Sequence, residues 1–152
     1  MLTRLATAAL ALAVTLPVGA QTHEQERPPG TGVTAELVGT VWQWTDFQDS
    51  ADDGHASVQV PDPAKYTLTL GSDGTAHIQA DCNHLSWTYE REESRLTFNT
   101  LGPGTLAHCG DQSLDQRYLE LLGNTATHVI AEGTLYLNVK ADSGNMIFIP
   151  TR

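Results

Sequence analysis

Histidine and aspartate side chains gather around the two cysteines of this chain. His77, Asp81 and His84 lie close together in the sequence, and His108 directly precedes Cys109. Two imidazoles and a carboxylate can bind Zn²⁺ or Cu²⁺, so one hypothesis is a periplasmic metal-binding or hydrolytic site built from these side chains. The alternative is that the histidines are solvated or locally hydrogen-bonded. We favour this alternative, since the expected strand turns His77 and Asp81 outward, and we expect no cofactor.

Cys82 and Cys109 are the chain's two cysteines. An even pair in an oxidising compartment most often forms a disulfide, which here would stabilise the fold by roughly 3–4 kcal/mol. Two free buried thiols or a metal-binding pair remain as alternatives. Asn83 follows the end of a strand, where its side chain is suited to bonding backbone groups, and Asp81 could join the same polar corner. We interpret Asn83 as structural.

No pattern in the chain matches a catalytic signature. There is no G-x-S-x-G elbow for a serine nucleophile, and the serine, histidine and aspartate residues follow no ordered template. A cysteine in a disulfide is not a nucleophile, so a cysteine–histidine mechanism would require the bridge to be absent. We therefore predict that the protein is not an enzyme.

The first twenty residues have the pattern of a cleavable signal peptide (1–20). A positively charged start is followed by an apolar run over residues 5–16 and by small residues before Gln21, which predicts cleavage after Ala20. About a dozen apolar residues are too few to span a membrane core of ~30 Å. No cysteine lies near the cleavage site, so we expect no lipid anchor. The expected product is a soluble periplasmic or secreted protein without membrane insertion.

The charge balance is strongly acidic. The chain has 18 acidic and 8 basic residues and a formal net charge of −10, which becomes −11 when Arg4 is removed. This surface disfavours nucleic acids and anionic membranes, which bind basic patches. Residues 21–35 are polar and rich in proline and glycine, which predicts a flexible linker before a single domain over residues 36–152.

Alternating apolar and polar residues predict most of this domain. From residue 65 onward the alternation indicates an antiparallel meander with strands near 65–70, 76–82, 85–90 and 96–98. An earlier strand is expected at 40–47, and 57–60 could pair briefly. We assign Trp42 and Trp44 to opposite faces of the first strand, so that at most one enters the core.

One helix interrupts the strands. Ser113 and Gln116 have the spacing of a capping box, and Gly123 stands where a helix commonly stops. One apolar stripe lies between them: Leu114, Tyr118, Leu121 and Leu122. Three more strands are expected near 126–130, 134–139 and 145–149. About eight strands and one α-helix predict a mainly β fold, a single small antiparallel β-barrel-like domain.

Several of these segments, taken in order, resemble the META domain family, also called HslJ-like. The segments are an L-x-G-T-x-W start at 37–42, the hairpin at 66–74, the Cys-Asn pair within 80–83, the second cysteine element at 105–109, the helix, and closing hairpins at 133–137 and 144–148. Ser86 and Trp87 stand where members commonly have a glycine. The resemblance implies a compact β-barrel-like domain of the cell envelope, associated with stress tolerance, heat response or antibiotic resistance, without an established reaction.

The sequence and this resemblance together favour a non-enzymatic domain of the cell envelope. We expect it to bind an unknown partner protein or small ligand there, or to serve envelope stress tolerance. A purely structural secreted module has the same sequence signature. The metal-binding or hydrolytic protein that uses His77, Asp81, His84 and His108 remains the alternative from a different class.

Overall fold

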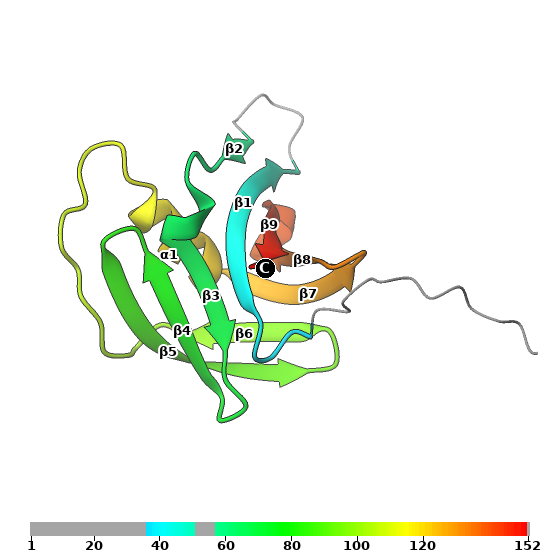
Figure 1. Cartoon of the computed structure of the whole chain (residues 1–152). Helices are drawn as coiled ribbons and strands as arrows, with labels where there is room; N and C mark the ends of the chain where they lie inside the picture. The colour runs from blue at the N-terminus through cyan, green and yellow to red at the C-terminus, as the bar shows by residue number, and fades with distance from the viewer. Residues whose placement is uncertain (1–35, 51–56, 152) are drawn as a thin grey trace, which may run out of the picture. The chain divides into compact units, whose positions relative to one another are not determined.

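The computed structural model of the chain describes residues 36–50 and 57–151 (Figure 1). The expected signal peptide (1–20) and linker (21–35) lie outside the described residues. Within the described ranges, no helix is long and apolar enough to cross a membrane.

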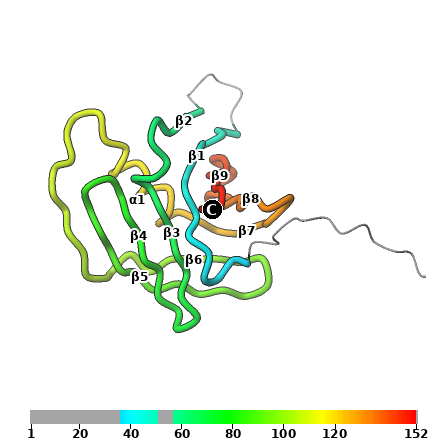
Figure 2. The backbone as a smooth tube through the Cα atoms, in the orientation of Figure 1, coloured from blue at the N-terminus to red at the C-terminus, as the bar shows by residue number. Residues whose placement is uncertain are grey.

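The described residues form one antiparallel sheet of nine strands (Figures 1 and 2). In chain order these are β1 (Val41–Asp49), β2 (Val58–Gln59), β3 (Tyr66–Leu70), β4 (Thr75–Ala80), β5 (Asn83–Glu92), β6 (Arg95–Asn99), β7 (Thr125–Ala131), β8 (Thr134–Val139) and β9 (Gly144–Pro150). The spatial order is β2-β1-β3-β4-β5-β6-β7-β8-β9, and β1 also pairs with β9. This last pairing closes eight strands into a barrel and leaves β2 outside it. The predicted mainly β, barrel-like fold is confirmed.

The core is formed by the inward side chains of the strands and by the apolar face of one helix, α1 (Asp115–Gly123), which contributes Tyr118, Leu121 and Leu122. Trp42 and Trp44 are both fully buried, at 0% exposure. Residues two apart in a strand share a face, so our assignment of the two tryptophans to opposite faces was wrong. The Trp44 ring stacks on Tyr118 of α1, with the ring centroids 5.1 Å apart. Both indoles donate to backbone carbonyls, which makes their burial possible.

The start of α1 differs from the predicted capping box. The N-cap residue is Leu114, which makes no side-chain cap, and the Ser113 hydroxyl accepts a hydrogen bond from the Asp115 amide at 3.2 Å. The Leu114 amide instead donates to the hydroxyl of Tyr66 on β3, at 2.9 Å. The helix ends at Gly123, as predicted, but Gly123 is its last residue and has no positive φ, so the expected position just after the helix was wrong. A strand side chain therefore anchors the start of this helix.

Two short 3₁₀ helices, η1 (Pro63–Lys65) and η2 (Lys140–Asp142), precede β3 and β9. Closure is uneven around the barrel. β6 pairs with β7 at a single position, Arg95 with Thr127, and the first half of β5 has no pairing with β6.

The segment that connects β6 to α1, residues 100–114, is named the strap here. Figure 2 shows it as a long trace beside β5.

Candidate functional site: the disulfide corner and the groove beside it

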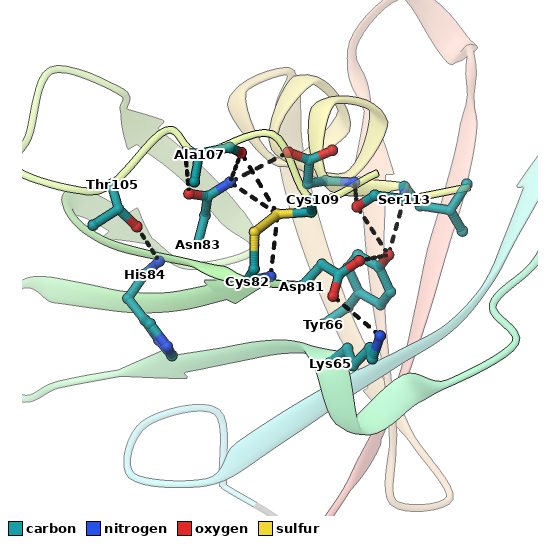
Figure 3. Close-up of a disulfide and its surroundings, with 12 residues drawn as sticks. Lys65, Tyr66, Asp81, Cys82, Asn83, His84, Thr105, Ala107, Cys109 and Ser113 are labelled. Atoms are coloured by element: carbon teal, nitrogen blue, oxygen red, sulfur yellow. Dashed lines mark hydrogen bonds and ion pairs between the residues drawn. A yellow bond between two sulfur atoms is a disulfide. The ribbon is translucent and has the colours of Figure 1, made fainter. Parts of the chain in front are cut away.

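The structure contains a disulfide between Cys82 and Cys109 (Figure 3). Cys82 lies in the turn between β4 and β5, and Cys109 lies in the strap. The two Cα atoms are 5.6 Å apart, and the residues are separated by 27 positions in the sequence. The bridge therefore ties the strap to the central hairpin of the barrel.

Asn83 holds the strap beside the bridge (Figure 3). The side chain is buried, at 1% exposure. Its amide donates to the Ala107 carbonyl at 2.9 Å, and its carbonyl accepts the Ala107 amide at 2.7 Å. The same amide group lies 3.3 Å from the sulfur of Cys109 and 3.3 Å from a carboxylate oxygen of Asp115. The backbone that Asn83 bonds is thus 24 residues away, not its own turn.

Asp81 occupies the other side of the corner. It follows β4 with a φ of 56°, and its side chain is 13% exposed and faces Lys65 and Tyr66 rather than open solvent. The expectation that Asp81 points outward from a strand was therefore wrong, because the left-handed turn redirects it. Lys65 Nζ lies 3.2 Å from Asp81 Oδ1. A hydrogen bond from the Ser113 hydroxyl and the Lys65 ammonium hold the pKa of the Asp81 carboxyl below its usual value.

The four candidate metal ligands do not converge. His77 on β4 is paired with Ser86 on β5, with Nδ1 and Oγ 3.4 Å apart. His108 lies in the strap, where its ring is 3.4 Å from the exposed carboxylate of Asp111. Across the part of the chain that the structure describes, no three His, Cys, Asp or Glu side chains are grouped so that they could hold a metal ion. The bridge brings His108 to the corner without assembling the proposed ligand set.

A groove of about 400 Å³ lies beside the corner, on the outer face of β3, β4 and β5. Cross-strand pairing places its polar side chains in two rows of three. One row is Thr67, Gln79 and His84; the other is Thr69, His77 and Ser86. Residue types alone indicated the two histidines. The hydroxyl and amide groups were missed, although the alternation that predicted the strands also turns them outward.

The strap forms the wall of this groove through Pro103 and Gly104. It continues the sheet beside the first half of β5: the Ser86 amide donates to the Pro103 carbonyl at 2.9 Å, and the Thr105 amide donates to the His84 carbonyl at 3.0 Å. At Gly104 a Cβ would lie 2.8 Å from Leu85 Cγ. The wall is therefore held by backbone pairing, by Asn83 and by the disulfide.

Close approach of the strap to β5 depends on Gly102. A Cβ at this position would overlap the Ser86 carbonyl oxygen. Ser86 faces the groove and Trp87 enters the core at 5% exposure, so β5 stays regular where the resemblance led us to expect a glycine. The glycine that permits close packing here lies on the strap.

The architecture defines a small closed β-barrel with one helix packed against its core and a strap cross-linked to its central hairpin. The family model of the META domain matches residues 35–151, and the chain belongs to this family. No curated protein matches the chain. The expected family membership is confirmed.

The fold is shared with known structures, including the following two. A DUF4847 family protein from Bacteroides vulgatus is 16% identical, with a TM-score of 0.57, and the match covers 74% of this chain and 93% of that one. A protein from Burkholderia xenovorans is 21% identical, with a TM-score of 0.59, and the match covers 83% of this chain and 97% of that one. At these identities the likeness concerns the fold alone.

Proposed function

We propose that this META-domain protein is an exported, non-enzymatic binding protein of the cell envelope, and that its ligand occupies the groove beside the disulfide corner. The observation that carries the proposal is the cross-linked wall of that groove. A disulfide is stable in an oxidising compartment, which agrees with the signal-peptide pattern at residues 1–20.

The wall of the groove is fixed before any ligand arrives. The strap is joined to the barrel covalently at Cys109, by two hydrogen bonds at Ala107, and by backbone pairing with β5. Ordering a flexible loop on binding costs affinity, and restraints of this kind remove that cost. A purely structural module would need the cross-link for stability but would have no use for a preorganised groove.

A thermal-shift assay tests the groove. The mature protein is heated with fractions of the organism's envelope extract, and a fraction that contains the ligand at about a hundred times its Kd should stabilise the protein by about 2.7 kcal/mol, which raises Tm by roughly 10 °C. The shift should be lost in the groove variants Gln79→Ala and His84→Ala. It should persist in the matched controls Gln112→Ala and His108→Ala, which lie outside the groove. Equal loss in all four, or no shift with any fraction, would favour a structural module.

The cellular part of the proposal has its own tests. N-terminal sequencing of the protein from the periplasm or medium should begin at Gln21, and mass spectrometry without reduction should recover a linked Cys82–Cys109 peptide pair. Two alkylatable thiols would contradict an oxidised, exported form. A deletion strain screened across heat and envelope-active compounds tests the stress-tolerance role, and wild-type growth under all of them would argue against it.

A further inference from the structure

We infer that the ligand of the groove is a neutral, polyhydroxylated molecule, namely a segment of a sugar chain. The inference rests on the proposed function and adds the chemical class of the ligand. It is drawn from the charge, the hydrogen-bonding capacity and the layout of the groove's side chains.

The groove lacks acidic, lysine and arginine side chains, although the protein is acidic. The chain has 18 acidic and 8 basic residues, yet the lining contains no Asp, Glu, Lys or Arg. An anionic ligand would be repelled by the net charge of −10 and would find no arginine or lysine in the groove to bind it. A cationic ligand would find more favourable sites at the carboxylates elsewhere. Charge complementarity therefore favours a neutral ligand.

The polar side chains of the groove both donate and accept hydrogen bonds. Hydroxyl, amide and imidazole groups can each donate and accept hydrogen bonds, as sugar hydroxyls do. His77 and Ser86 bond each other, whereas no side-chain hydrogen bond is formed by Thr67, Thr69, Gln79 or His84 with other described residues. These groups are available to a ligand dense in hydroxyls.

The layout suits an extended chain. Three neighbouring strands span roughly 10 Å, and same-face residues along a strand lie roughly 7 Å apart, so the two rows form a short platform. A groove of about 400 Å³ that is open to solvent can hold part of a long molecule, and Pro103 offers an apolar contact at the wall. A small isolated ligand would be better served by an enclosed pocket.

The test is an NMR titration of the isotope-labelled, oxidised mature protein with three defined neutral probes: maltohexaose, cellohexaose and fully N-acetylated chitohexaose. At least one, at up to about 10 mM, should shift amide signals of residues 67–69, 77–79, 84–86 and 102–105. Its Kd should rise at least about tenfold in Gln79→Ala and His84→Ala, and should change less than about twofold in Gln112→Ala and His108→Ala.

Four outcomes would overturn the inference: no shifts with any probe, shifts centred outside the groove, equal weakening in the groove and control variants, or tighter groove binding by the anionic probes heparin and polyphosphate. The thermal-shift assay with envelope fractions tests the binding function separately from the sugar ligand. A groove-dependent thermal shift without oligosaccharide binding refutes the sugar ligand and leaves the binding function standing. Failure of both assays refutes both.

Discussion

Removal of the Cys82–Cys109 bridge should lower the free energy of unfolding, because the unfolded chain gains conformational entropy. The native contacts of the strap, through Asn83 and β5, remain available without the sulfur atoms. The unfolded chain, however, gains the freedom of a loop closed at a sequence separation of 27, which corresponds to about 3.5 kcal/mol at 25 °C. For a domain of this size the expected fall in Tm is roughly 15 °C.

Equilibrium unfolding in urea measures this effect. We expect the double variant Cys82→Ala/Cys109→Ala to unfold at a lower midpoint with a larger m-value, because the uncross-linked denatured chain exposes more surface. Wild-type protein kept in reductant is the matched control, and it should agree with the double variant within about 1 kcal/mol. Agreement between the two proteins would show that the loss of stability comes from the missing cross-link and not from the alanine side chains.

The size of the change decides whether this reasoning holds. A loss below about 1 kcal/mol would mean that the denatured chain already holds the two segments together. A loss well above about 5 kcal/mol, with an unchanged m-value, would mean that the bridge supports native packing directly. Either result would refute the assignment of the effect to the unfolded state.

Three further predictions concern the strap and the contact between β7 and the start of β6. Asn83→Ala removes both hydrogen bonds to Ala107 and should lower the free energy of unfolding by about 2–3 kcal/mol in urea titrations, with proteolytic cleavage appearing in the strap. Gly102→Ala places a Cβ against backbone and should cost about 1–3 kcal/mol, read as loss of amide-exchange protection along β5. Burial lowers the pKa of His128, which bonds the Ser94 carbonyl at 3.0 Å. As the pH is lowered below the ordinary value of 6.5, the unfolded state binds protons before the folded state does, so the free energy of unfolding should decrease until the pH reaches the folded pKa. His128→Gln should flatten that part of the stability–pH curve.

The sequence predicted the meander well because the signal there is local. In β3 and β4 the apolar residues face the core and the polar residues face outward, as predicted. The structure differs from the prediction at the strand ends: β4 stops at Ala80 because Asp81 takes a left-handed conformation. The helix was placed by its apolar stripe. Its capping failed as a prediction because the Leu114 amide is bonded by Tyr66, 48 residues earlier, and no local pattern encodes that partner.

The groove lay beyond prediction for a different reason. Thr67, Gln79 and His84 become neighbours only through the register of three strands, and one shifted residue would have turned each to the other face. The strap has no periodicity, so its position against β5 depends on contacts that the sequence does not display. Asn83 attracted attention as a neighbour of cysteine, but its partner Ala107 carries no distinguishing side chain.

The pairing of β1 with β9 has a consequence for how the chain reaches its fold. Thr45 on β1 donates to the Ile147 carbonyl on β9, 102 residues later, whereas the disulfide spans 27. Closing the longer loop costs about 1 kcal/mol more entropy, and such long-range pairing slows folding. The central hairpin can therefore form and be cross-linked while the barrel is still open. Because β9 is the last of the described strands in chain order, the ring closes only when synthesis has delivered it.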